Sequence, residues 1–269
     1  MVIIKRNLLL ISLLFLGVLS MPIGASAQEL QQGKNVLPEE YVNTERTKDV
    51  LSDTKKVITD YMNQKLSMYN VFVVDKDIYS IPKYNDRSKR VQGLINYNDR
   101  EIIVHNNYST ESSERILLHE IGHSIDTWDT LDGYTYKSIG KYSHTDEFKD
   151  IFKDECSSLT KYADEYYFKT DIQEFFAESF AIYMTKPDVV KYKAPRLFAY
   201  MEKINELKPV LGWKSGTNGR WYYMENNGYK TGWFKDKDNW YYFNPDNGEM
   251  MTTVVIDGYS IAPNGVMVS

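Results

Sequence analysis

The sequence predicts an α+β fold, in which helices and a small mixed sheet are followed by a module of short β hairpins. Two observations lead to this prediction. The stretch from Leu117 to Ile125 contains two histidines in the pattern H-E-x-x-H, within an apolar stripe at helical spacing. Toward the end of the chain, tryptophans and tyrosines recur with a period of about 20 residues between Asn-Gly turn signals. The 269 residues allow one enzyme-sized domain and a small appended module.

The first 27 residues have the pattern of a secretory signal peptide. Lys5 and Arg6 form a basic start, and Ala25-Ser26-Ala27 forms a small-residue cleavage site. The apolar run between them, about 12 residues, is shorter than the roughly 20 residues that span a bilayer. We therefore expect a secreted protein with no membrane span in the mature chain. Its formal net charge of −5, which falls further when Lys5 and Arg6 are removed, argues against a nucleic-acid partner.

Composition divides the mature chain into three parts. Residues 28–44 are polar, and we expect a flexible lead-in. Residues 45–208 hold the strand and helix patterns of the main domain, and residues 209–269 hold the aromatic repeats. The single cysteine, Cys156, allows no internal disulfide, so core packing must stabilise the fold.

The first elements of the main domain alternate between helix and strand patterns. Apolar residues at helical spacing from Glu45 to Met68 predict one amphipathic helix. Residues 71–74 predict a strand, and residues 91–97 and 101–105 predict a hairpin around a turn at 98–100. We expect the second arm of this hairpin to provide a free edge on which an extended peptide pairs backbone to backbone.

The histidine helix is expected to begin between Ser109 and Ser113 and to end before Asp132-Gly133. His119 and His123 lie on one face and can bind a single Zn²⁺ ion through their ring nitrogens. Glu120 is then placed to take a proton from a zinc-bound water molecule. The alternative is a pair of structural histidines, but buried imidazoles without a partner would be costly.

A third ligand is sought among the downstream carboxylates. Asp129 stands at the last position of H-E-x-x-H-x-x-G-x-x-H, but Asp126 replaces the glycine that makes the bend. Glu174 and Glu178 share one face of a helix that begins near Asp171, so one can bind the metal while the other supports a ligating histidine. The alternative is that Asp171 and Glu174 form a capping box and that Glu178 faces solvent.

The remaining histidines and the last helix of the domain complete the pattern. His105 is expected at the surface or at the substrate edge, and His144 in a loop, because the zinc ligands are already provided. Residues 194–207 predict another helix, with Pro195 in its first turn.

The motifs H-E-x-G-H and E-F-F-A-E-S-F closely resemble those of the zinc metalloprotease domain of anthrax lethal factor and of the related secreted Pro-Pro endopeptidases. The resemblance covers roughly residues 45–208 and includes 148–153, 158–162 and Ala194-Pro195. It implies a zincin-like domain in which His119, His123 and Glu174 bind zinc. Glu120 would be the general base, and Glu178 would be the hydrogen-bond partner of His119.

That family also uses a tyrosine, seven residues before the glutamate ligand, to stabilise the oxyanion. The corresponding residue here is Tyr167, whose phenol could donate a hydrogen bond to the tetrahedral intermediate. The S-L-T-x-Y stretch that carries this tyrosine in some relatives ends here at Tyr162. Tyr162 and Tyr166 are therefore alternatives, and simple packing of this tyrosine-rich stretch is another.

The C-terminal units resemble the choline-binding, or cell-wall-binding, repeats of Gram-positive surface proteins and clostridial toxins. Gly-Trp at 212–213 recurs at 232–233, and Trp-Tyr-Tyr at 221–223 recurs at 240–242, while a third copy at 254–267 lacks tryptophan. In that family, aromatic rings of successive hairpins bind choline by cation–π attraction. The resemblance implies choline-bearing teichoic acid or a cell-wall glycan as a partner; the alternative is that the rings only hold the hairpins together. The matching residues are Trp213, Trp221, Tyr222, Trp233, Trp240 and Tyr241.

Together these patterns predict a secreted zinc endopeptidase that acts on an extended peptide or protein and is retained at a Gram-positive cell wall. Two alternatives are a non-catalytic envelope-binding or adhesion protein with a structural zinc site, and a toxin protease subunit. Glu120 favours catalysis, because a structural zinc site needs ligands but no base. The resemblance to Pro-Pro endopeptidases implies proline near the cleavage site.

Overall fold

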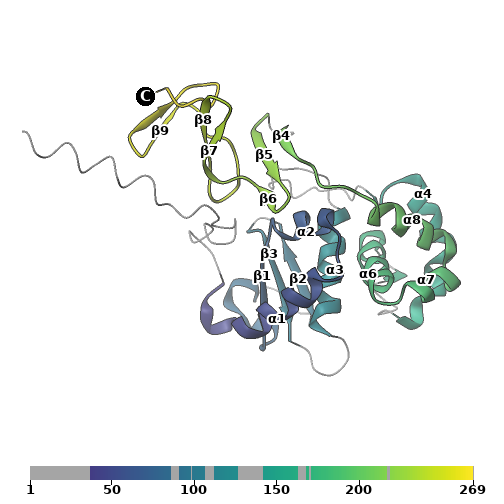
Figure 1. The fold of residues 1–269 in the computed structure, drawn as a ribbon. Helices are drawn as coiled ribbons and strands as arrows, with labels where there is room; N and C mark the ends of the chain where they lie inside the picture. The colour runs from purple at the N-terminus through teal and green to yellow at the C-terminus, as the bar shows by residue number, and fades with distance from the viewer. Residues whose placement is uncertain are drawn as a thin grey trace, which may run out of the picture.

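In the computed structural model, the first helices of the chain pack on one small sheet and the later helices form a group beside it. The β hairpins of the C-terminal residues lie above the sheet (Figure 1). Mixed helices and small sheets confirm the predicted α+β class. The signal-peptide prediction for residues 1–27 lies outside the described residues. Among the residues described, no helix is both long enough and apolar enough to cross a membrane. The structure describes residues 37–85, 91–97, 99–106, 112–126, 142–162, 168–169, 171–216 and 219–268.

Three strands, β1 (Asn70–Val74), β2 (Gly93–Asn96) and β3 (Glu101–His105), form the sheet of the main domain. The strand order is β1-β3-β2, with β1 parallel and β2 antiparallel to β3. The predicted hairpin of β2 and β3 is confirmed. The expectation that its second arm provides the free edge is wrong, because β3 is paired on both sides; β2 is the edge strand on this side of the sheet.

The predicted single helix over 45–68 is wrong, because the chain forms two helices there. These are α1 (Thr44–Lys55) and α2 (Asp60–Leu66). The Thr59 hydroxyl accepts a hydrogen bond from the backbone N–H of Met62 and so starts a new helix. Both helices carry apolar faces, which explains why their spacing reads as one pattern.

The histidine helix, α3 (Ser113–Asp126), packs directly against α6 (Ile172–Thr185), and both helices confirm their predictions. The two backbones approach closely at Gly122, where an added Cβ would lie 2.7 Å from Ala177 Cα. This close packing holds the two functional faces together.

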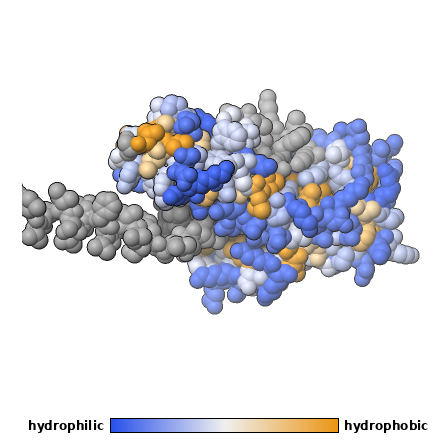
Figure 2. All heavy atoms as spheres, turned by 45° about the horizontal axis from the view of Figure 1, so that its top comes forward, coloured by the Kyte–Doolittle hydropathy of each residue, from blue (hydrophilic) through white to orange (hydrophobic). Residues whose placement is uncertain are grey.

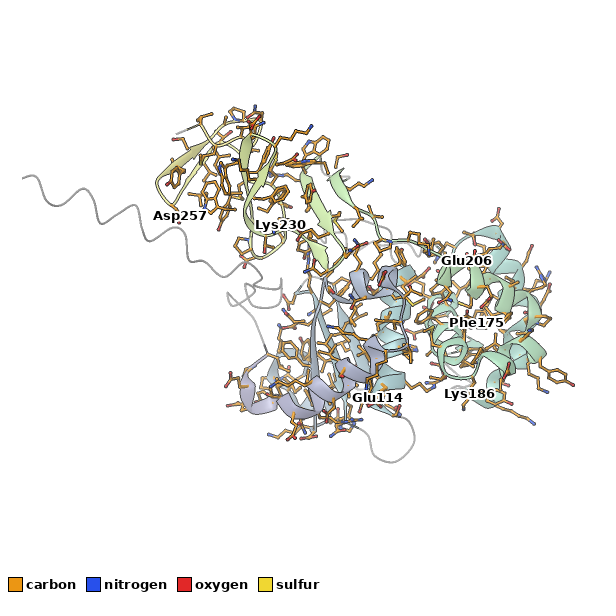
Figure 3. All side chains as sticks on the ribbon, in the orientation of Figure 1. Glu114, Phe175, Lys186, Glu206, Lys230 and Asp257 are labelled. Atoms are coloured by element: carbon orange, nitrogen blue, oxygen red, sulfur yellow. The ribbon has the colours of Figure 1, made fainter. Side chains whose placement is uncertain are left out.

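Helices α4 (Asp146–Glu155), α7 (Pro187–Lys193) and α8 (Pro195–Asn205) pack around α6 (Figure 1). The helix expected over 194–207 is therefore confirmed as α8. Aromatic rings fill the space between these helices; Phe175 of α6 lies among them in Figure 3, and the fully buried members include Phe148, Phe168, Phe175, Phe176 and Phe180. Short 3-10 helices are η1 (Glu39–Tyr41), η2 (Ile78–Ser80), η3 (Pro82–Tyr84), η4 (Cys156–Ser158) and η5 (Thr160–Tyr162).

The repeat module consists of antiparallel strands, as the turn signals predict. One sheet contains β4, β5 and β6 in that order, β7 pairs with β8, and β9 pairs with β10. In Figure 2 apolar side chains gather on this module, whose last hairpin exposes Val255. The strands are β4 (Gly212–Ser215), β5 (Trp221–Glu225), β6 (Gly228–Tyr229), β7 (Gly232–Asp236), β8 (Asn239–Phe243), β9 (Val254–Ile256) and β10 (Tyr259–Ile261).

Candidate metal centre and aromatic site

Three side chains from α3 and α6 converge on one point. His119 Nε2 and His123 Nε2 lie 3.1 Å apart. Glu174 Oε2 lies 3.3 Å from the first of these nitrogens and 3.4 Å from the second. Within the described ranges, this is the one cluster of histidine, cysteine or acidic side chains able to surround a metal ion.

The spacing of these atoms fits zinc. A tetrahedral zinc ion with ligand distances of about 2.0–2.1 Å requires ligand atoms about 3.3 Å apart. The three measured separations, 3.1, 3.3 and 3.4 Å, lie close to that value. Two imidazole nitrogens and one carboxylate oxygen also leave a fourth position for water or substrate, as in catalytic zinc sites.

A carboxylate and a guanidinium support the first histidine from the side away from the cluster. Glu178 Oε2 lies 2.9 Å from His119 Nδ1, and its other oxygen pairs with Arg115. Arg115 also donates to the backbone carbonyl of Tyr162 at 3.3 Å. The side chain of Glu178 is only 12% exposed, so the alternative that it faces solvent is wrong.

The capping-box alternative for Glu174 is also wrong. Asp171 caps α6 by accepting a hydrogen bond from the backbone N–H of Gln173 at 2.7 Å. Glu174 instead turns toward the two histidines. The carboxylate is thereby free to act as a ligand.

The charges of this cluster call for a cation. Burial lowers the pKa of His119, but hydrogen bonds to Glu174 and Glu178 outweigh it and raise the pKa to about 10. Burial raises the pKa of each glutamate, but hydrogen bonding to His119 outweighs it and holds both below their usual range. The two carboxylates therefore stay ionised and stabilise either a proton on His119 or a metal ion in its place.

Glu120 lies on the buried side of α3 against the edge strand. It is 4% exposed, and burial raises its pKa, partly offset by His119 and His123. A Cβ added at Gly93 of β2 would lie 2.3 Å from Glu120 Oε1. Gly93 thus leaves room for this carboxylate, a role that sequence reasoning missed; the only signal is a glycine within a strand pattern.

Tyr97, just after β2, is a second residue that sequence reasoning missed. Burial and the nearby negative charges, including those of Glu120 and Glu174, raise the pKa of Tyr97 well above its usual value. Its ring lies edge-on to that of Tyr69, with centroids 6.4 Å apart. The phenol therefore lies in the same electrostatic environment as the cluster.

Among the other candidates from the sequence, Tyr166, Tyr167 and Asp129 lie outside the described ranges, so the oxyanion tyrosine stays a prediction. Tyr162 has its ring 5.6 Å from Lys186 Nζ. His105 ends β3, and His144 Nδ1 lies 2.9 Å from the Ser143 hydroxyl.

Aromatic rings from two successive hairpins gather at the start of the repeat module. The ring of Trp213 lies 6.4 Å from that of Trp221 and 4.7 Å from that of Tyr241, measured between centroids. The Trp213 indole N–H donates to Asp236 at 2.8 Å, which holds the second hairpin against the first. Trp221 is 45% exposed, so the group is open to solvent.

The remaining predicted aromatics differ in their surroundings. Tyr222 is fully buried, and its hydroxyl lies 3.3 Å from Glu249, so it contributes to the core of the module. Trp233 donates to Asp257 at 3.0 Å and packs edge-on against Tyr242. Trp240 is 40% exposed.

The chain matches two family models. The first, described as anthrax toxin lethal factor, N- and C-terminal domain, covers residues 26–204, which is more than half of the chain. The second, described as choline-binding repeat, covers residues 210–253. No curated protein matches the chain.

Solved structures resemble the two parts separately. The Pro-Pro endopeptidase PPEP-2 from Paenibacillus alvei is 21% identical, with a TM-score of 0.46, covering 63% of this chain and 96% of that chain. Choline-binding protein F from Streptococcus pneumoniae is 39% identical, with a TM-score of 0.20, covering 22% of this chain and 20% of that chain. This chain thus spans about a fifth of the length of choline-binding protein F.

The coverage of the lethal factor model supports a metallopeptidase, and that of the second model confirms the expected repeats. The chain belongs to the family of the anthrax toxin lethal factor N- and C-terminal domains, with choline-binding repeats after that domain.

Proposed function

We propose that this chain is a secreted zinc-dependent endopeptidase that its repeats retain at a choline-bearing cell wall. The arrangement of His119, His123 and Glu174, with spacing suited to tetrahedral zinc beside a buried glutamate, carries the proposal. The family match supports the peptidase, and the N-terminal sequence pattern supports export.

In the proposed mechanism, His119, His123 and Glu174 would hold one Zn²⁺ ion. Bound zinc would polarise the scissile carbonyl and make a water molecule more acidic. Glu120 takes a proton from the attacking water and passes it to the nitrogen of the leaving amine as the C–N bond breaks. Burial raises the pKa of Glu120, which suits a group that must first accept and then donate a proton.

Two further groups orient the reaction. Glu178 holds the ring of His119 through Nδ1, so the opposite nitrogen faces the metal position. Tyr167 donates a hydrogen bond to the oxyanion that forms at the scissile carbonyl. The substrate lies extended along β2, because this strand is at the edge of the sheet within the described residues and Gly93 faces Glu120.

The repeat module binds a quaternary ammonium group between Trp213, Trp221 and Tyr241. These rings come from two hairpins and remain partly exposed, as a cation–π site requires. Choline titration monitored by tryptophan fluorescence tests this site. Trp221→Ala abolishes the response, whereas a matched Val255→Ala change on the last hairpin preserves it; equal responses in both variants would contradict the site.

The peptidase is tested with a diverse library of quenched peptides that includes proline pairs. The purified protein cleaves a subset of these peptides, loses activity on chelation and regains it with zinc. Cleavage that persists without metal would contradict the zinc mechanism. A protein that binds one zinc ion yet cleaves neither peptides nor cell-wall proteins would support the adhesion alternative instead.

A further inference from the structure

A buried glutamine joins the main domain to the first repeat. Gln64 of α2 is 1% exposed. Its side-chain amide accepts a hydrogen bond from Val210 N at 3.0 Å and donates to Val210 O at 2.8 Å. The same amide also donates to Glu225 O at 2.6 Å. The Gln64 side chain thereby makes the hydrogen bonds that a neighbouring strand would make to two backbone segments of the repeat module.

A second contact comes from the turn between β2 and β3. The guanidinium carbon of Arg100 lies 4.5 Å from the ring centroid of Tyr229, which is 4% exposed. Arg100 also donates to the backbone carbonyl of Asn247 at 3.4 Å. The Tyr229 ring also packs on Gly248, where an added Cβ would lie 2.2 Å from the ring. The ring is thus enclosed by both parts of the chain.

Backbone contact completes this surface. Gly228 of β6 lies against Ser67 at the end of α2, where an added Cβ would be 3.6 Å from Ser67 O. Figure 1 shows β6 directly beside α2 and the end of the sheet. Gln64, Ser67 and Arg100 therefore form one docking surface on the main domain, and we refer to these three residues by that name.

The docking surface connects the two proposed sites through short paths. Val210 lies three residues before Trp213, and Glu225 lies four residues after Trp221. Gln64 therefore binds the segment just before β4 and the end of β5, and these two strands carry the tryptophans. Arg100 lies on the turn that follows β2, the strand whose Gly93 faces Glu120. The docking surface therefore contacts the segments that carry the aromatic site, and its Arg100 belongs to the same hairpin as β2, which faces Glu120.

We propose that the docking surface makes the main domain and the first repeat a single cooperative folding unit. A ligand bound at the aromatic site then stabilises the metal site, and zinc stabilises the repeats. This coupling rests on the proposed function of the two sites, because choline and zinc are the ligands that reveal it. It follows from linkage, since each ligand favours the state in which both parts are folded.

The test is thermal unfolding of the full chain, monitored by two signals. Helical circular dichroism reports the main domain, which contains all the helices of the described residues. Tryptophan fluorescence reports mainly the repeats, which carry four of the five tryptophans. In the parent the two transitions coincide, and saturating choline chloride raises both midpoints by the same several degrees; zinc also raises both, and a chelator lowers both.

Two variants uncouple the parts. Gln64→Ala removes three hydrogen bonds, and Arg100→Ala independently removes the contact with Tyr229. In each variant, the unfolding transition measured by fluorescence separates from the one measured by circular dichroism. Choline then raises only the fluorescence midpoint. Tyr229→Phe is the matched control, because its buried hydroxyl has no hydrogen-bond partner within the described residues; this variant keeps coincident transitions.

Separate transitions in the parent, each moved only by its own ligand, would overturn the coupling. So would coincident transitions in both alanine variants. If direct titration shows no choline binding, the proposed repeat ligand fails, and the zinc and chelator shifts of the fluorescence signal still decide the coupling. If zinc binding also fails, the coincidence of transitions in the parent and their separation in the two variants decide it.

Discussion

Glu178 of α6 contacts His119 of α3 at 2.9 Å, on the ring nitrogen opposite the one that faces Glu174. The contact joins the two helices behind the metal position. Arg115, one helical turn before His119, pairs with the second oxygen of Glu178. An imidazole held in this way keeps its orientation and its tautomer, and the carboxylate makes it a more basic metal ligand.

Glu178→Gln should weaken zinc binding without removing a ligand. The amide keeps the size of the side chain but loses the charge that pairs with Arg115 and attracts the His119 N–H. Outer-shell changes of this kind typically cost about 10–100-fold in metal affinity or activity. Competition with a chelator of known zinc affinity measures the loss. Glu174→Gln, which removes a proposed ligand, should cost more; equal zinc affinity in the parent and Glu178→Gln would contradict the role of Glu178.

Gly93→Ala should reduce turnover while zinc binding persists. The added methyl group would overlap Glu120 Oε1 and approach Ile116, so the carboxylate must move. A displacement near 1 Å at a catalytic group can cost about a hundredfold in rate. Steady-state kinetics together with zinc content tests this. Gln92→Ala, at the exposed neighbouring position, is the control; a Gly93→Ala enzyme with parental kcat would show that Glu120 does not act from this position.

The stability of the metal-free protein should fall as pH rises above neutrality. Because the folded pKa of His119 is about 10 and the usual value is about 6.5, its protonated form stabilises the fold fully below pH 6.5. That stabilisation is lost as pH rises toward 10, by at most about 1.4 kcal/mol per pH unit. Zinc binding has the opposite trend, because zinc displaces this proton.

Denaturant unfolding between pH 6.5 and 10, in chelator and in zinc, measures both trends. His119→Asn should flatten the metal-free pH dependence, because the titrating ring is gone. A metal-free parent whose free energy of unfolding stays constant across this range would contradict the charge assignment.

Local sequence patterns predicted the parts of the site that lie on single helices. The i, i+4 spacing placed His119 and His123 on one face, and the same-face carboxylates located Glu174 and Glu178. Their convergence depends on the packing of Gly122 against Ala177, and no periodicity encodes this long-range contact. The paired motifs indicated it only through the resemblance to a known family.

Long-range pairing explains what the sequence did not reveal. The hairpin pattern located β2 and β3, but it could not show that β1 pairs in parallel with β3 and leaves β2 at the edge. The break between α1 and α2 depends on one cap at Thr59 within a continuous apolar pattern. Gln64 reads as an ordinary polar residue of a helix, yet it is buried by segments about 150 residues further along the chain.

The central claim is that Glu120 acts as the base of a zinc peptidase, and peptide cleavage by the parent and by Glu120→Gln tests it most directly. Both proteins are compared at one zinc ion per chain, on the peptides that the parent cleaves. The account predicts that both bind zinc and that Glu120→Gln loses at least about a hundredfold in kcat, the usual lower range for a positioned general base. Parental turnover by a zinc-loaded Glu120→Gln protein would contradict it.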